Sequence, residues 1–307
     1  MRARLIAAFA AVYLVWGSTY LAIRFAVETL PPLLMAGARF LIAGVILLLW
    51  SRLRDSAARP TRIDWRTGFI SGALLLLGGN GGVVWAEQRV PSGIAALLVA
   101  VVPLWMVLLD WMRPEGRRPP ALVFVGLGLG LAGLALLIGP DSLHGHAEIS
   151  VVGAIVLVLA SLSWAAGSLY TKHAPRPSSG LNGAAAQMIA GGGLLVVAGA
   201  LSGEFSRLDL AHASSRSILG FLYLVSFGSL IGFTAYVYLL AHTTAAKAAT
   251  YAYVNPVVAV LLGWAFASEP ITRRTLLAAA VILAGVAIIT AARDRDVRAP
   301  ERERAVA

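Results

Sequence analysis

The 307-residue sequence contains no cysteine, and charged residues make up only 13% of it. The absence of cysteine excludes disulfides, thiolate catalysis and cysteine-ligated zinc or iron–sulfur sites. No HExxH, GxSxG or Walker A motif occurs, nor does a complete kinase or dinucleotide-binding fingerprint. His144 and His146 stand near Asp141 and Glu148, but two histidines two positions apart are too weak a pattern to predict a metal site. We therefore expect no enzymatic activity, no cofactor and no metal.

Polar composition is equally sparse, because 59% of the residues are hydrophobic and the mean hydropathy is +0.80. A soluble protein this apolar would aggregate, so we expect the folded chain to be solvated by lipid. Acidic residues number 15 against 25 basic ones, which gives a net charge of +10. The basic residues lie in short segments between apolar runs, and this distribution favours a membrane protein over a nucleic-acid-binding protein.

Ten segments are long and apolar enough for membrane-spanning helices, which need roughly 20 residues each. We predict helices at 5–26, 33–51, 68–86, 92–111, 121–139, 150–170, 181–201, 217–240, 246–267 and 275–292. Prolines mark several of the breaks, for example Pro31-Pro32 and Pro119-Pro120. The first segment follows basic residues, as a cleaved signal would, but it stays apolar to Val27. We therefore predict a retained membrane helix.

Two halves of the chain carry the same motifs in the same order. The clearest match pairs 98–103 (LVAVVP) with 251–256 (YAYVNP), at an offset of 153 residues. A second match joins two tryptophans that each precede a basic residue by eight positions, Trp16 with Arg24 and Trp164 with Lys172. An internal repeat in a membrane protein is typical of transporters.

Each half holds five predicted helices. Because five is an odd number, the second half must enter the membrane from the opposite side. With the N-terminus in the cytoplasm, cytoplasmic segments hold 18 basic residues and outer loops hold 5. The predicted fold is all-α and integral to the membrane, with ten transmembrane helices in two inverted five-helix repeats and both termini cytoplasmic. The repeats are 5–139 and 150–292, and 293–307 is predicted to be a short, charged, disordered tail.

Several of these segments resemble EamA-type transporters of the drug/metabolite transporter superfamily. VWGSTY at 15–20, Pro31-Pro32 and ARF at 38–40 resemble the opening of that family. A subgroup of bacterial inner-membrane, exporter-like members is similar at four further motifs: GNG at 79–81, AE at 86–87, VPSGIAA at 90–96 and YAYVNPV at 251–257. The resemblance covers about residues 5–292 as two EamA domains.

The resemblance implies ten helices with both termini in the cytoplasm, in agreement with the count of basic residues. It also implies export of amino acids, metabolites or drug-like compounds through a cavity lined by the first four helices of each repeat. The fifth and tenth helices are implied to lie at the periphery.

Polar and aromatic residues inside the apolar spans are the candidates for substrate binding and translocation. Arg39 lies about seven residues into the second helix, where a charge costs a few kcal/mol unless it faces a polar interior. It is a candidate anchor for a substrate carboxylate; a structural ion pair or snorkelling is the alternative. The other candidates are the aromatic Trp16, Tyr20, Trp164, Tyr251 and Tyr253 and the hydrogen-bonding Ser18, Thr19, Asn80, Gln187 and Asn255.

Asn80 is flanked by four glycines between Gly78 and Gly82, and each glycine weakens a helix by about 1 kcal/mol relative to alanine. Such a segment favours either an interrupted helix that lines the site or a close contact between helices. Glu87 ends the third helix and is a candidate proton carrier, with an interfacial cap as the alternative. Pro103 and Pro256 are candidates for matched hinges or plain kinks, because proline removes a backbone donor.

The predicted function is secondary transport across the cytoplasmic membrane, with export of small amphipathic metabolites by alternating access. Protons are a candidate coupling ion, and membrane lipid and the small-molecule substrate are the expected partners. A passive facilitator of the same substrates is the first alternative. The second is a membrane-embedded enzyme acting on lipid-linked substrates, which would need a convergent acid–base pair that these scattered ionisable groups do not suggest.

Overall fold

The computed structural model of the chain describes residues 2–54, 59–114, 120–143 and 150–306, and the secondary structure in these ranges is helical without strands. Seven of the described helices are long and apolar enough to cross a membrane: Ala3–Ala26, Pro32–Arg54, Arg62–Ala86, Ser92–Trp111, Val151–His173, Gly180–Leu201 and Ser215–His242. Ala121–Leu137 and Val254–Ala267 are shorter apolar helices.

The first half of the chain forms five rods of helix. They comprise α1 (Arg2–Ala26), α2 (Pro32–Arg54), α3 (Arg62–Gly72) with η1 (Ala73–Gly81) and α4 (Gly82–Ala86), α5 (Ser92–Val99) with α6 (Val102–Trp111), and α7 (Ala121–Leu143). The third rod begins six residues before its predicted start because Thr61 and Asp64 form a capping box. In that box Thr61 Oγ1 accepts from the Asp64 N–H (3.2 Å) and Asp64 accepts from the Thr61 N–H (2.6 Å).

The second half repeats this pattern. It comprises α8 (Val151–His173), α9 (Gly180–Leu201), the short 3₁₀ helix η2 (Glu204–Arg207), α10 (Ser215–Tyr223) with η3 (Leu224–Phe233) and α11 (Thr234–His242), α12 (Ala245–Ala248), α13 (Tyr251–Ala267) and α14 (Arg273–Val306). Three helices start at a serine N-cap whose hydroxyl accepts the N–H three residues on, at Ser150, Ser179 and Ser214.

One expectation about the C-terminus is wrong. The predicted disordered tail at 293–307 is helical as far as Val306, because α14 continues through it. The arginine, glutamate and alanine residues of this segment have favourable helix propensities, and they extend the helix beyond its apolar part.

Contacts between distant segments show that the two halves run in opposite directions. At one end of the bundle, called here the Lys172 end, Asp64 in the first turn of α3 accepts hydrogen bonds from Ser178 before α9. At the other, called the Arg24 end, Glu204 after α9 accepts from the Leu34 N–H at the start of α2 (2.9 Å). Helix α1 ends at the Arg24 end and α8 ends at the Lys172 end, so these equivalent first helices are antiparallel.

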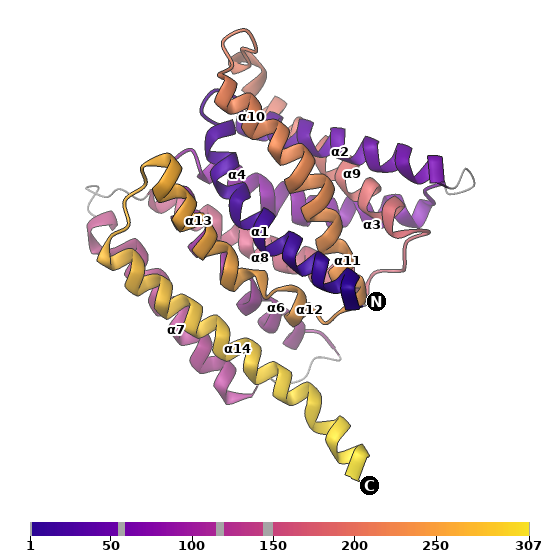
Figure 1. Ribbon diagram of the computed structural model, residues 1–307, viewed down its shortest axis with the longest axis vertical. Helices are drawn as coiled ribbons and strands as arrows, with labels where there is room; N and C mark the ends of the chain where they lie inside the picture. Colours follow the sequence, from indigo (N-terminus) through magenta and orange to yellow (C-terminus); the bar gives the residue numbers. More distant parts are fainter. Residues whose placement is uncertain (1, 55–58, 115–119, 144–149, 307) are drawn as a thin grey trace.

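Equivalent helices of the two halves also pair with each other. Helix α2 packs along α9, where a Cβ added at Gly37 would lie 2.9 Å from the Gly192 carbonyl oxygen, so only small residues permit this approach. Helices α7 and α14 pack along one another and lie at the edge of the molecule, with the N-terminus of the chain beside α11 (Figure 1). The remaining elements surround the centre of the bundle.

Candidate functional site

A small cavity of about 70 Å³ lies at the centre of the bundle, between elements of both halves. Helices α1, α2, α4 and α5 and the segment η1 contribute from the first half, and α8, η3 and α13 contribute from the second. Eight of the residues predicted as candidates line it: Trp16, Thr19, Tyr20, Arg39, Asn80, Trp164, Tyr251 and Asn255. The structure thus brings together residues spread over most of the chain.

Aromatic side chains form one wall of this region. The Trp16 ring lies 5.4 Å from Trp164, 4.9 Å from Tyr236 and 5.4 Å from Tyr251, measured between ring centroids. Each aromatic pair of this kind stabilises the fold by about 0.5–1.5 kcal/mol, in addition to the stabilisation that comes from buried apolar area. The Tyr236 hydroxyl forms a hydrogen bond of 2.6 Å with Ser168 Oγ, so the ring is fixed in α11 against α8. The cluster is rigid, apolar and bordered by hydroxyl groups.

The two central tryptophans pack against π-helical segments in equivalent places. In η1, a Cβ added at Gly79 would lie 2.8 Å from Trp164 Cε3, and in η3 a Cβ at Gly232 would clash with Trp16 Nε1. These glycines are 153 residues apart and the tryptophans 148 apart, so the two contacts are equivalent under the repeat. π-Helical turns are frequent at functional sites. The predicted interruption near Asn80 is therefore a continuous but widened helix.

Arg39 is the charged group of the cavity lining. Its side chain is only 4% exposed, and its Nε and Nη1 atoms have no hydrogen-bond partner among the described residues. The guanidinium lies 4.3 Å from the centroid of the Phe40 ring. Two further buried atoms of the lining, Asn80 Oδ1 and Trp164 Nε1, are likewise unpaired within the described part of the chain. Unpaired buried donors and acceptors are costly, so a cluster of them in one cavity indicates a ligand.

Glu87 is fully buried at the end of α4, and neither of its carboxylate oxygens has a partner in the ranges that the structure describes. Its backbone carbonyl accepts a hydrogen bond from Arg24 Nη1 (3.1 Å). The carboxyl group is outside the cavity lining. It therefore lies between the cavity and the Arg24 end without a fixed counterion contact.

Two of the predicted candidates whose side chains are described, Ser18 and Gln187, are not in the lining. Ser18 Oγ donates to the Val15 carbonyl (2.7 Å) and bonds the Tyr223 hydroxyl (2.6 Å), which fixes it between α1 and α10. Gln187 is buried between α9 and α8, where its Nε2 donates to Thr171 Oγ1 (3.3 Å). The side chain of Tyr253 lies outside the described residues.

The two prolines occupy different positions in their helices. Pro103 stands in the first turn of α6, after Ala100 and Val101 separate α5 from α6. A proline is favourable there because its missing N–H would have no partner in a first turn. Pro256 stands inside α13, where it removes one hydrogen bond. Asn255, turned so that its amide nitrogen donates to the Tyr13 carbonyl (3.1 Å), ties this part of α13 to α1.

Equivalent basic residues close the two ends of the bundle. Arg24 Nη1 donates to the Glu87 carbonyl after α4, and Lys172 Nζ donates to the Leu240 carbonyl in α11 (3.3 Å) and to the Thr243 carbonyl (2.7 Å). Glu87 and Leu240 are 153 residues apart, so each repeat uses one basic residue to bind the C-terminal carbonyls of its own third rod. Positive charge at a helix C-terminus is stabilising.

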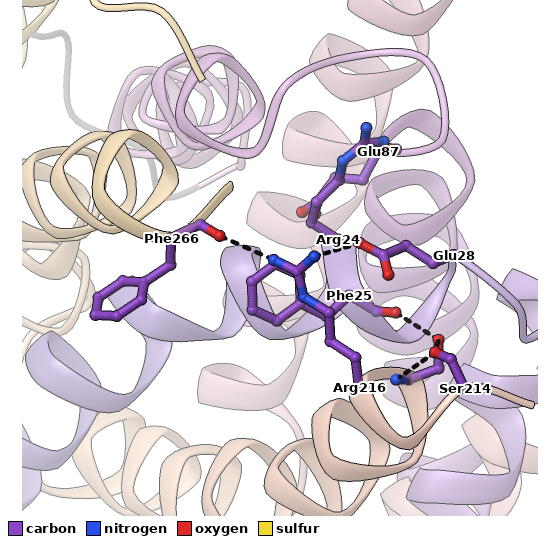
Figure 2. A network of polar contacts seen from close by, with 8 residues as sticks. Arg24, Phe25, Glu28, Glu87, Ser214, Arg216 and Phe266 are labelled. Atoms are coloured by element: carbon purple, nitrogen blue, oxygen red, sulfur yellow. Dashed lines mark hydrogen bonds and ion pairs between the residues drawn. The ribbon is translucent and has the colours of Figure 1, made fainter. Parts of the chain in front are cut away.

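Arg216 adds a second connection at the Arg24 end (Figure 2). Its Nη2 donates to the Phe266 carbonyl (2.8 Å), its Nη1 lies 3.5 Å from Glu28 Oε1, and its guanidinium lies 3.6 Å from the centroid of the Phe25 ring. These contacts join the ends of α1, α10 and α13. Polar contacts therefore tie helices together at both ends of the bundle.

Several residues of this region were not among the predicted candidates. They include Phe233 and Gly228, which line the cavity, and Gly232, which contacts Trp16. The repeat carried a signal for two of them, because Gly232 and Phe233 are the counterparts of Gly79 and Asn80 at the offset of 153 residues. Gly228 has no comparable sequence signal.

Comparison with known proteins agrees with this architecture. The EamA-like transporter family matches the chain twice, at residues 3–139 and 151–291. The "Uncharacterized inner membrane transporter YedA" of Escherichia coli K12 is 42% identical over 290 residues, covering 93% of this chain and 90% of YedA. The "Probable amino-acid metabolite efflux pump" of the same strain is 24% identical over 289 residues, covering 90% of this chain and 91% of that protein.

A solved structure with 21% sequence identity superposes with a TM-score of 0.65 and covers 94% of this chain and 97% of its own, which supports the fold. The two family matches together span nearly the whole chain and coincide with its two structural halves. On these grounds the chain is a member of the EamA-like transporter family, built from two EamA repeats and crossing the membrane several times.

Proposed function

We propose that the chain is a secondary transporter of the inner membrane that exports small metabolites, amino acids or drug-like amphipathic compounds. Its ten helical rods would each cross the membrane, with both termini and the Lys172 end in the cytoplasm. The distribution of basic residues supports this orientation, since 18 fall on the proposed cytoplasmic side and 5 on the outer side.

The observation that carries the proposal is the set of unpaired polar atoms in an aromatic cavity. Arg39 and Trp164 present unused donors, and Asn80 presents an unused acceptor. Arginine binds carboxylates with strong, charge-assisted hydrogen bonds, while aromatic rings favour an apolar body. A zwitterion or carboxylate with an apolar part satisfies both requirements. The name of the efflux pump relative points to the same class of compound.

The cavity volume supports alternating access as the mechanism. Ligand sites usually measure about 300–1,000 Å³, far above the room available here. The cavity of about 70 Å³ is too small for such a substrate without rearrangement of the surrounding helices. Substrate would enter only after one end opens, and inverted repeats supply two nearly equivalent packings for that exchange.

The remaining residues take roles that follow from their positions. Trp16, Tyr20, Trp164, Tyr251 and Tyr253 would provide aromatic contacts, and Thr19, Asn80 and Asn255 would provide hydrogen bonds. Ser18 and Gln187 would act indirectly, by holding α1 on α10 and α9 on α8. The break before Pro103 and the proline-containing helix around Pro256 would be the places where the two repeats bend.

Glu87 is the proposed site of proton coupling. It is a buried carboxyl group without a partner in the described structure, and it lies between the cavity and the proposed outer face. Such a group is stable only when a cation pairs with it or a proton neutralises it. A passive facilitator of the same substrates, with Glu87 as a structural residue, is the alternative.

Flux in liposomes separates these possibilities. The purified protein would be tested with a panel of labelled amino acids and aromatic metabolites, with and without an imposed pH gradient. We expect concentrative flux that collapses with the gradient, and loss of that concentrative component in Glu87→Gln. Flux that only dissipates a substrate gradient would establish the facilitator instead. No flux of any panel member would reject the proposed substrate class.

A further inference from the structure

A second pocket, separate from the central cavity, opens at the Lys172 end of the bundle. It measures about 520 Å³ and lies between the start of α3, the residues after α6 and the end of α8. Ile63, Arg66 and Thr67 line it from α3, Arg113 from the end of α6, and Tyr170 and His173 from α8. It thus joins two helical rods of the first repeat to the first helix of the second repeat.

The charged groups of this pocket are mainly basic. Arg66 makes no ion pair within the described residues, and Arg113 faces Asp110, whose Oδ1 lies 3.4 Å from Arg113 Nη1. Asp64, the acidic residue of α3, already accepts hydrogen bonds from Ser178 and Thr61. The pocket therefore has two guanidinium groups and only one nearby carboxylate that could neutralise them, which gives it an excess of positive charge. Paired arginines are suited to phosphate because they bind it through several parallel hydrogen bonds.

His173 fixes the orientation of Arg113. Its Nδ1 donates to the Leu169 carbonyl (2.8 Å), which is the normal partner for a ring N–H one helical turn earlier. Its Nε2 is then the lone-pair nitrogen and accepts from Arg113 Nη1 (2.6 Å). Arg113 Nη1 makes the contacts to His173 and Asp110, and we expect Nη2 and Nε to serve as donors toward an anion.

Apolar and aromatic residues surround the pocket on the outer surface of the bundle. Ile63 on its rim is 50% exposed, and Trp65 and Trp111, at 40% and 39%, lie on the same helix ends. Exposed tryptophans in a membrane protein favour the level of the lipid headgroups. A basic pocket at this depth is open to the lipid interface, and acyl chains would continue along the exposed apolar faces beside it.

From these observations we propose that the pocket binds the phosphate of an anionic phospholipid headgroup, held by Arg66 and Arg113. Thr67 and Tyr170 offer hydroxyls for the rest of the headgroup. The proposed orientation places the pocket in the cytoplasmic leaflet, where anionic lipids attract basic residues with about 1 kcal/mol per residue. The site is independent of substrate transport, because none of its lining residues is shared with the central cavity.

The test is lipid retention measured by native mass spectrometry on the full chain in neutral detergent, titrated with phosphatidylglycerol or phosphatidylcholine. Wild type is expected to retain one phosphatidylglycerol in preference to phosphatidylcholine. Arg66→Gln should weaken that binding about fivefold, the equivalent of about 1 kcal/mol per basic residue. Arg62→Gln is the matched control, because Arg62 is an exposed arginine on α3 outside the pocket lining.

Two results would overturn the proposal. Equal losses in Arg66→Gln and Arg62→Gln would show general electrostatic attraction rather than a built pocket. Displacement of the lipid by an equal concentration of glycerol phosphate or inorganic phosphate would assign the pocket to a soluble phosphate compound. Arg66 is exposed and makes no ion pair among the described residues, so its replacement should leave folding intact, and thermal unfolding of the variant checks this.

Discussion

Arg39 in the first repeat and Gln187 in the second hold equivalent positions, 148 residues apart, yet only Arg39 lines the cavity. The same contrast recurs in the third rods, where Asn80 corresponds to Phe233 at an offset of 153 residues. Glu87 likewise corresponds to Leu240. At these three positions the first repeat carries the more polar side chain. The second repeat contributes other polar groups to the cavity, namely those of Trp164, Tyr251 and Asn255.

The backbone features do not follow this asymmetry. Both third rods contain a π-helical segment, both segments pack a glycine against the tryptophan of the other repeat, and both first helices bind C-terminal carbonyls through a basic residue. The two repeats therefore share these backbone features. Under the proposed function, the side chains that differ between the repeats would determine what the cavity binds.

The largest effect on transport should come from replacing Arg39, whose charge has no counterpart at Gln187 in the second repeat. Hydrogen bonds to a charged group contribute about 1.5–3 kcal/mol, so Arg39→Gln should reduce the uptake efficiency of a carboxylate substrate by roughly 10- to 150-fold. The matched variant Gln187→Met should change it by less than about threefold, because Gln187 makes one hydrogen bond outside the cavity. Counterflow in liposomes measures both, and similar losses in the two variants would contradict a one-sided site.

The next largest effect concerns the contact between a π-helical glycine and a tryptophan, which both repeats share. Gly79→Ala and Gly232→Ala should each destabilise the protein by about 1–3 kcal/mol and reduce flux, because the added methyl group overlaps Trp164 or Trp16. Gly193→Ala on α9 is the control, since a Cβ there meets nothing within 4 Å, and it should be neutral or stabilising. Thermal unfolding in detergent reports the differences. A neutral result at only one of the two glycines would break the equivalence of the repeats.

A smaller effect distinguishes the two tryptophans. Trp16 Nε1 donates to the Gly228 carbonyl (3.2 Å), whereas Trp164 Nε1 is unpaired in the described structure. Trp16→Phe should therefore cost about 1 kcal/mol of stability for the lost hydrogen bond. Trp164→Phe should be about 1 kcal/mol less destabilising than Trp16→Phe, because both variants lose ring packing but only Trp16→Phe also loses a hydrogen bond. It should weaken substrate binding instead. Unfolding and binding titrations on both variants check this, and equal behaviour would remove Trp164 as a ligand donor.

The smallest effect concerns the closures of the two ends. Charge at a helix C-terminus contributes about 0.3–1 kcal/mol, so neutralising Arg24 or Lys172 should shift the open population about two- to fivefold. Arg24→Gln should favour opening at the Arg24 end and Lys172→Gln at the Lys172 end. Because the chain contains no cysteine, a single introduced thiol reports accessibility from each side. Shifts in the same direction for both variants would contradict their opposed roles.

Sequence reasoning succeeded where the membrane imposes a simple rule. Helix positions followed from the length of apolar runs, and the family followed from short motifs such as those around Trp16 and Pro256. It also placed Arg39 and Asn80 near the centre, because polar side chains inside a membrane helix are costly unless they face a polar interior. Eight predicted residues indeed meet in one cavity, although the function of each stays a prediction.

The rest depended on the direction of side chains, which hydropathy does not contain. Ser18 and Gln187 were expected beside the substrate, but rotation of their helices turns them toward Tyr223 and Thr171. The glycines around Asn80 left open an interrupted helix or a close contact between helices. The helix widens into a π-helix without breaking, and Gly79 packs closely on Trp164. The tail after residue 292 lacks apolar periodicity, yet α14 continues through it to Val306.

The measurement that tests alternating access most directly is the labelling of one cavity residue from both sides of the membrane. Val83 lines the cavity beside Arg39 and Asn80 without taking part in the proposed polar contacts, so Val83→Cys is the reporter. In intact cells and in inside-out vesicles, a membrane-impermeant thiol reagent should react with this cysteine from either face. A transported amino acid or amphipathic metabolite should slow both reactions. Reaction from one face only, or from neither, would contradict a central cavity that opens to each side in turn.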